Sequence, residues 1–185
     1  TAAVQTALMP ARAEAASDQP AADNQSPRSW YTINALAASE PTVEIYIYDV
    51  IGYWGVSAQQ FISDCKAAGV FSAKQINLHI HSPGGDVMDG FAIYNTLARL
   101  TCKIDIWNDG LAASMASVIL CLPNATVHMP SNAWVMIHKP WSGAVGNADD
   151  LRDLADWLDR NEALLLNAYE NKTGKPREEL AALLS

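Results

Sequence analysis

Hydrophobic and polar residues change their spacing several times along the chain, and each change predicts a new element. Short apolar or alternating runs predict strands at residues 44–48, 76–81, 103–107, 126–128 and 134–137. Apolar residues three and four apart predict helices at 57–69, 86–100, 112–120, 147–171 and from 175 onward. Because strands and helices alternate, we expect an α/β fold of βαβ units around a mainly parallel sheet.

The first 28 residues differ from the rest in composition. They include nine Ala and three Pro and almost no large apolar side chain. Such a stretch cannot bury enough surface to offset the entropy lost on ordering. We therefore expect residues 1–28 to be a flexible tail, with plain disorder favoured over a functional arm, and residues 29–185 to be one folded domain.

Composition narrows the class of protein. Half of the 185 residues are hydrophobic and the net charge is -8, which argues against a nucleic-acid or anionic-lipid partner. No apolar run reaches the roughly 18–20 residues of a membrane span, and no convincing secretory signal is present. Cys65, Cys102 and Cys121 are widely spaced, as is typical of thiols in a reducing compartment. We expect a cytoplasmic protein that does not bind membranes.

A pair of glycines follows the strand predicted at 76–81. Gly84 and Gly85 separate it from the next predicted helix. Glycines at such a turn let the backbone approach a ligand and leave N–H groups pointing outward. No Gly-Lys-Ser/Thr follows and a third glycine is absent, so neither a P-loop nor a dinucleotide site is indicated. Alone, the pair is more typical of an ordinary tight turn.

A serine lies in the first turn of the helix predicted at 112–120. Residues 108–110 (Asn-Asp-Gly) predict a turn before it, and small residues surround Ser114, which would admit a substrate carbonyl. The N–H of Met115 could bind developing negative charge. The layout resembles a nucleophile elbow that lacks the G-x-S-x-G pattern, and locally a capping serine is the favoured interpretation.

A histidine ends the strand predicted at 134–137. His138 could face a cleft there and act as a general base, although a lone histidine is more often structural. The glycine pair, Ser114 and His138 all fall at the end of a strand or the start of the next element. Open α/β sheets form their sites at that edge, so the combination favours an active site.

Segments 82–85 (SPGG), 109–117 (DGLAASMAS) and 136–140 (MIHKP) together resemble the ClpP family of serine peptidases. Segments 45–52 and 143–151 are similar to the ClpP-like head maturation proteases of tailed phages and prophages. The resemblance covers residues 30–185. It implies a ClpP/crotonase-like fold of stacked βαβ units with a long handle helix, and no cofactor.

The resemblance also implies a serine endopeptidase that works through an acyl-enzyme and processes phage capsid or scaffold proteins. Ser114 would be the nucleophile, His138 the general base, and the backbone amides of Gly85 and Met115 the oxyanion hole. Ala116 stands where the family commonly has Gly, a departure with little effect expected on the amide of Met115.

The third member of the family's triad, an acid past a Thr-Gly segment, is not present at the expected position. The chain has Leu or Ser there, or no residue at all, so the acid is unknown and we expect a domain that lacks its C-terminal segment. Glu178 and Glu179 are interpreted as part of a solvated helix face.

Two patterns are compatible with a metal site, but a structural role is favoured for both. Segment 149–153 (DDLRD) matches a magnesium-diphosphate motif, yet acidic residues behind Asn147 suit a helix N-terminus. His79 and His81 alternate on one strand without a carboxylate or Cys at compatible spacing, and a parallel strand would bury them. We predict no metal.

The helix predicted at 147–171 has a wider apolar surface than one monomer face needs. In the resembling family this helix joins two stacked rings, which implies a homo-oligomeric ring acting on a polypeptide substrate; an ATPase partner is left open. Two other functions also stay open. One is a catalytically silent structural subunit, which is favoured because no acid is found at the expected position. The other is a crotonase-like acyl-CoA enzyme, which the shared superfamily fold allows but against which the Ser–His pair argues.

Overall fold

A six-stranded sheet forms the centre of the computed structural model, which describes residues 28–36 and 41–184. The strands run in the order β1-β2-β3-β4-β5, and β6 pairs with β4 outside that path. Their bounds are β1 (Tyr31–Leu36), β2 (Thr42–Ile47), β3 (Gln75–Ser82), β4 (Lys103–Ala113), β5 (Ala125–His128) and β6 (Trp134–Met136). Only the β1–β2 pair is antiparallel, so the prediction of a mainly parallel α/β sheet is confirmed. Nearly all of the predicted tail lies outside the described residues.

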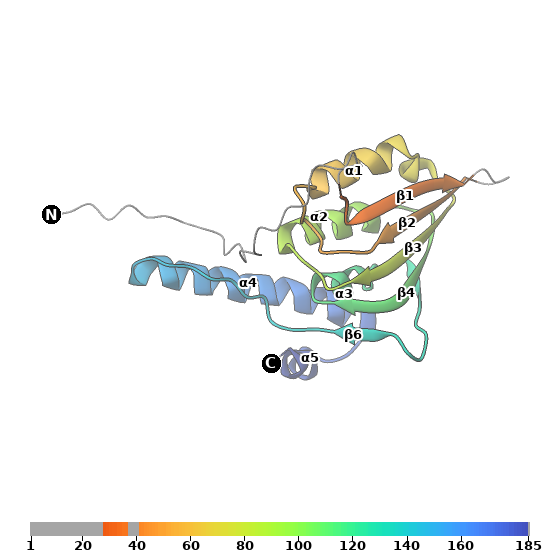
Figure 1. The fold of residues 1–185 in the computed structure, drawn as a ribbon. Coiled ribbons are helices and arrows are strands. Elements are labelled where there is room, and N and C mark those ends of the chain that lie inside the picture. The colour runs from red at the N-terminus through yellow and green to blue at the C-terminus, as the bar shows by residue number, and fades with distance from the viewer. Residues whose placement is uncertain (1–27, 37–40, 185) are drawn as a thin grey trace.

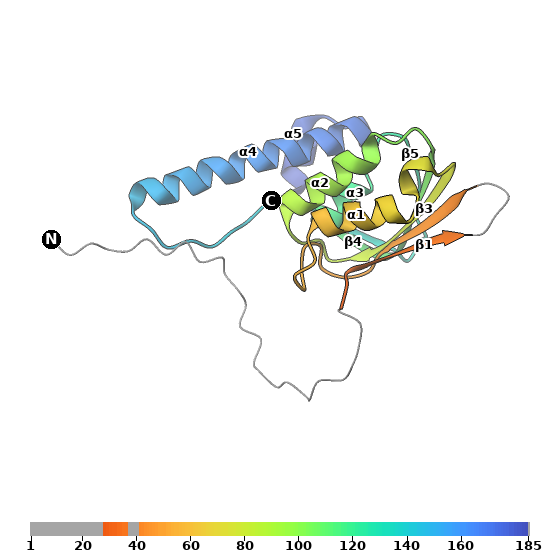
Figure 2. The ribbon, with the colours of Figure 1, turned by 90° about the horizontal axis from the view of Figure 1, so that it is seen from above.

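Five α-helices accompany the sheet in the described part of the chain. They are α1 (Ala58–Ala67), α2 (Val87–Ala98), α3 (Met115–Ile119), α4 (Ala148–Thr173) and α5 (Arg177–Leu183), with a short 3-10 turn at Val70–Ser72. α1 and α2 cover one face of the sheet, and α4 extends well beyond its edge (Figures 1 and 2).

The core lies between that sheet face and the helices. Ile45, Leu78 and Ile106 occupy paired positions on β2, β3 and β4, and none is accessible to solvent. Phe61 of α1 and Ile93 of α2 pack against this face and are also fully buried. Burying these large apolar side chains stabilises the fold by about 1.5–3 kcal/mol each.

The opposite face of the sheet is more exposed than we expected for parallel strands. His79 and His81 were predicted to be buried, but His81 is exposed and His79 keeps 22% of its side chain accessible. The Nδ1 atom of His79 lies 2.7 Å from a carboxylate oxygen of Asp109. The prediction was wrong because it assumed helices on both faces, which is the usual arrangement of parallel sheets.

Two further local predictions fail, and β1 was not foreseen. The turn predicted at 108–110 does not form: β4 continues to Ala113, because the Asn108 side chain donates a hydrogen bond to Trp134 O and accepts one from Gly110 N. The helix predicted at 112–120 therefore starts only at Met115.

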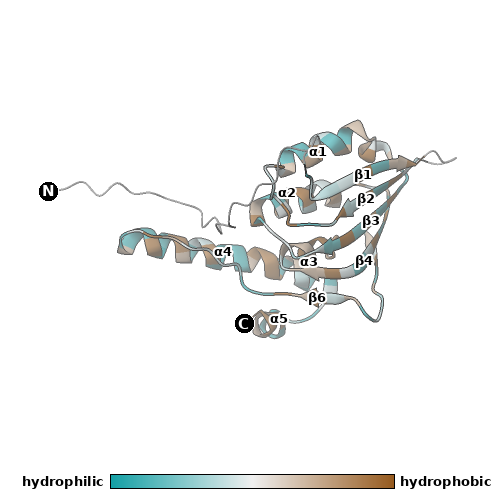
Figure 3. Cartoon of the chain, in the orientation of Figure 1, coloured by the Kyte–Doolittle hydropathy of each residue, from teal (hydrophilic) through white to brown (hydrophobic). Residues whose placement is uncertain are grey.

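The long helix α4 begins as expected. The Asn147 side chain accepts bonds from the N–H groups of Asp149 and Asp150, and the Asp150 carboxylate accepts the N–H of Asn147. This capping box confirms the structural interpretation of the acidic segment at 149–153. Figure 3 shows hydrophobic residues along the part of α4 that projects from the sheet, and Leu151, Trp157 and Leu164 are exposed. Over the residues described, no helix is both long and apolar enough to cross a membrane.

Candidate active site

A serine and a histidine meet just beyond the carboxyl ends of β4 and β6. The Nε2 atom of His138 lies 2.7 Å from the Oγ atom of Ser114, across 24 positions of sequence. Both residues are partly exposed. This is the separation a general base needs to take a proton from a hydroxyl nucleophile.

Strand pairing explains why the two side chains meet. β6 pairs in parallel with the end of β4, with Ala113 opposite Met136. The N–H of Ser114 then donates to the carbonyl of Met136 at 2.8 Å. Since parallel strands end at the same edge of a sheet, Ser114 and His138 leave their strands side by side. The N–H of Lys139 donates to Leu184 O at 3.1 Å and so ties the segment after His138 to the end of α5.

The backbone of Ser114 is strained. Its φ of 51° and ψ of -126° lie in a region that L residues rarely occupy. A conformation of this kind costs about 1–3 kcal/mol and persists only where the surroundings fix it. A sharp turn from strand to helix with a partly exposed serine at its apex is the geometry of a nucleophile elbow, which the sequence suggests without the usual glycines.

The glycine pair lies directly against this elbow. A methyl group on Gly84 would fall 2.7 Å from Ser114 Cβ and 2.8 Å from Met115 N. Gly85, with a φ of 151°, is equally confined, because a methyl group there would fall 2.1 Å from Ile51 O. Hydrogen bonds from Ile51 N to Gly84 O and from Asp86 N to Ile51 O hold the turn on both sides. Close packing of backbone therefore requires glycine at both positions.

Two backbone N–H groups beside Ser114 are left without a partner. Among residues 28–36 and 41–184, neither Gly85 N–H nor Met115 N–H donates a hydrogen bond. Unpaired amides next to a hydroxyl nucleophile can accept a developing negative charge on a substrate oxygen.

No carboxylate of the described segments is hydrogen bonded to His138. Glu162 of α4, which the sequence did not single out, forms an ion pair of 3.3 Å with Lys139, the residue after His138. Glu178 and Glu179 are exposed on α5, as predicted, and Glu179 pairs with Lys175. The third acid stays unassigned.

The three cysteines are free thiols that differ in burial. Cys65 and Cys121 are buried, and burial raises the pKa of each thiol to about 12, which leaves them as unreactive thiols. Cys102 is only half-buried. The part of the chain that the structure describes contains no group of three His, Cys, Asp or Glu residues that could hold a metal ion.

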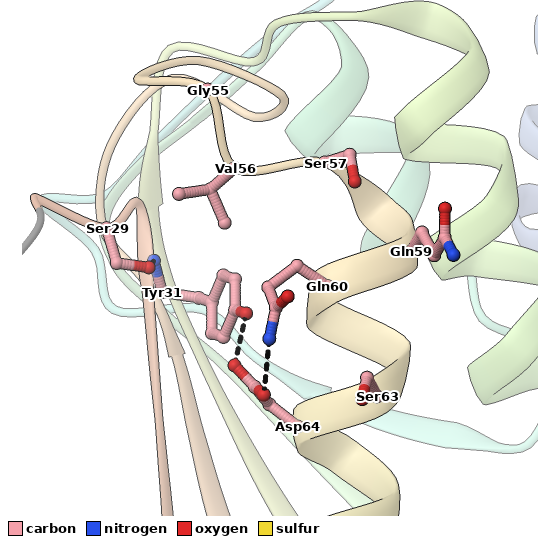
Figure 4. A pocket seen from close by; sticks show the side chains of 9 residues that line it. All are labelled: Ser29, Tyr31, Gly55, Val56, Ser57, Gln59, Gln60, Ser63 and Asp64. Atoms are coloured by element: carbon pink, nitrogen blue, oxygen red, sulfur yellow. Dashed lines mark hydrogen bonds between the residues drawn. The ribbon is translucent and has the colours of Figure 1, made fainter.

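A separate polar cavity opens beside α1. It has a volume of about 660 Å³, and Figure 4 shows Tyr31 and Gln60 directed at the carboxylate of Asp64. The Tyr31 hydroxyl donates to Asp64 at 2.6 Å and the Gln60 amide at 2.8 Å. None of the predicted site residues lines this cavity.

Comparison with known proteins points to one family. The family model of the Clp protease matches residues 58–185. An ATP-dependent Clp protease proteolytic subunit of Dehalococcoides mccartyi strain 195 is 38% identical over 116 residues, which cover 58% of this chain and 54% of the relative. The subunits of strains BAV1 and CBDB1 are 37% identical over the same length and shares. The chain thus spans about half the length of the curated relatives it matches.

Proposed function

Because the chain belongs to the Clp protease family, we propose that it is a serine endopeptidase with Ser114 as nucleophile and His138 as general base. The observation that carries the proposal is the 2.7 Å contact between Ser114 Oγ and His138 Nε2. The strained backbone of Ser114 and the two unpaired amides beside it support the same assignment.

The proposed reaction has two halves. His138 Nε2 accepts the proton of Ser114 as Oγ attacks the peptide carbonyl, and the N–H groups of Gly85 and Met115 bind the resulting oxyanion. The protonated histidine then gives its proton to the leaving amine, which breaks the peptide bond and leaves an ester on Ser114. Water, deprotonated by His138, hydrolyses this ester and returns the serine. For His138 to accept at Nε2, its neutral ring must carry the proton on Nδ1.

The substrate we propose is a capsid or scaffold protein of a tailed phage or prophage, cleaved in the cytoplasm of a bacterial host by a homo-oligomeric ring. Support comes from segments 45–52 and 143–151, which are similar to phage head maturation proteases, and from the exposed apolar residues of α4. The relatives named above are proteolytic subunits of an ATP-dependent protease, so an ATPase partner is a second arrangement to test.

Hydrolysis of a protein substrate tests the proposal. Purified wild type is incubated with fluorescently labelled casein and, separately, with a tailed-phage scaffolding protein, beside the Ser114→Ala variant. We expect wild type to release peptides and the variant to release none, and discrete scaffold fragments would favour a processing role. Equal release by both proteins would refute the role of Ser114. No release by wild type would favour the silent structural subunit.

A further inference from the structure

One peptide group carries two separate features of the site. The peptide between Ser114 and Met115 presents the unpaired N–H of Met115 at one side and the carbonyl of Ser114 at the other. That carbonyl accepts two hydrogen bonds, from Ser117 Oγ at 2.6 Å and from Ser117 N at 2.9 Å. In a planar trans peptide the C=O and N–H bonds point in opposite directions, so whatever holds the carbonyl also directs the N–H.

The Ser117 hydroxyl is itself held by the long helix. Its Oγ lies 2.7 Å from the hydroxyl of Tyr169 on α4, and both side chains are buried. A serine hydroxyl has a single proton, and Ser117 donates it to the Ser114 carbonyl. Tyr169 must therefore be the donor in its bond to Ser117. Burial raises the pKa of the Tyr169 phenol to about 12, so this proton is retained at neutral pH.

We propose that Ser117 and Tyr169 are positioning residues, which fix the Ser114–Met115 peptide so that the Met115 N–H faces the substrate oxyanion. Neither residue touches substrate in this account. The chain of donors runs from Tyr169 to Ser117 to the Ser114 carbonyl, and it stabilises a backbone conformation that is otherwise unfavourable at Ser114. Successive hydrogen bonds of this kind polarise one another, which strengthens the N–H as a donor. The inference rests on the proposed function.

The test uses the full chain and a small alkyl fluorophosphonate, whose reaction with serine also develops charge on an oxygen. Ser117→Ala should lower the limiting labelling rate by about 10-fold, the upper range for one neutral hydrogen bond, and leave the half-saturating probe concentration unchanged. Tyr169→Phe should lower the rate by about 3-fold. Because Tyr169 acts through Ser117, the double variant should be no slower than Ser117→Ala alone. Ser117→Thr, which keeps the hydroxyl, should recover most of the rate.

The pH profile and a control variant separate positioning from general loss of structure. Tyr94→Phe removes a phenol that contacts Cys121 O at 3.4 Å. Within the described residues this phenol makes no hydrogen bond to Ser114, Ser117 or Tyr169, so the variant should label at the wild-type rate. The midpoint of the rate against pH should be the same in all variants, because the base is untouched. If Ser117→Ala does not fold, the labelling rates of Tyr169→Phe and Ser117→Thr still test the positioning role.

The possible failures are distinguishable. Wild-type rates for Ser117→Ala and Tyr169→Phe, additive losses in the double variant, or a shifted pH midpoint would overturn the positioning role and leave the peptidase proposal intact. A wild type that never labels at Ser114 would overturn both.

Discussion

Gly84 and Ser114 are packed so closely that a single methyl group on Gly84 would lie 2.7 Å from Ser114 Cβ. The same methyl group would lie 2.8 Å from Met115 N, so Gly84→Ala must displace either the glycine turn or the elbow. Since loss of one oxyanion donor costs about 10²–10³ in rate, we expect Gly84→Ala to lower casein hydrolysis by at least about 100-fold.

Gly55 provides the matched control for that substitution. Its φ of 74° is also positive, but a methyl group there meets nothing within 4 Å. Gly55→Ala therefore carries a similar backbone penalty without the collision, and it should keep near-wild-type activity. Equal losses in the two variants would show that backbone strain, rather than contact with Ser114, determines the effect.

The strain at Ser114 predicts an unusual order of stabilities. Ser114→Gly and Ser114→Ala both remove the hydroxyl and should both be inactive, but only glycine accommodates a φ of 51° with a ψ of -126°. We expect the free energy of unfolding, measured by urea titration, to be about 1–2 kcal/mol larger for Ser114→Gly than for Ser114→Ala. An alanine variant that equals or exceeds the glycine variant would contradict the strained elbow.

The uncovered sheet face predicts a defined pH dependence. Hydrogen bonds from Lys103, then His128, and a further one from Gln75 lower the pKa of Asp105 from 3.8 to about 2. A carboxylate whose pKa is lower in the folded state contributes stability above pH 3.8, and this contribution is lost as the pH falls through about 2. Wild type should thus lose more unfolding free energy than Asp105→Asn between pH 4 and pH 2. Parallel stability curves for the two proteins would refute this effect.

The projecting helix predicts self-association. Leu164 of α4 is 50% exposed, which suits an apolar contact between copies of the chain. We expect light scattering to give a mass that is a multiple of 20.0 kDa for wild type and a smaller mass for Leu164→Glu. Phe71→Glu changes a side chain that is 49% exposed on the 3-10 turn and should leave the mass unchanged. A wild type that is monomeric at micromolar concentration would contradict the ring.

Most of the fold could be predicted from local patterns. The apolar runs of β2, β3 and β5 and the capped starts of α2 and α4 reflect short-range physics that a sequence displays directly. The prediction of a turn at 108–110 failed because long-range contacts outweighed the local signal. Asn-Asp-Gly is a strong turn signal, but pairing with β6 and the side chain of Asn108 keep β4 extended through it.

The residues of the candidate site could be predicted from the sequence, but the contacts that hold them in place could not. Ser114 and His138 fall at strand ends, which sequence can indicate, whereas their contact depends on the register of β6 against β4. The hydrogen bond between Ser117 and Tyr169 spans 52 positions of sequence. It has no sequence signature, because either residue alone is common on the buried face of a helix.

Covalent labelling is the most direct test of Ser114 as a nucleophile activated by His138. Wild type, Ser114→Ala and His138→Ala are treated with a fluorophosphonate, and the modified residue is located by peptide mass spectrometry. We expect one adduct on wild type, at Ser114, and essentially none on either variant, because the hydroxyl needs its base. An unlabelled wild type, or His138→Ala labelling as fast as wild type, would contradict it.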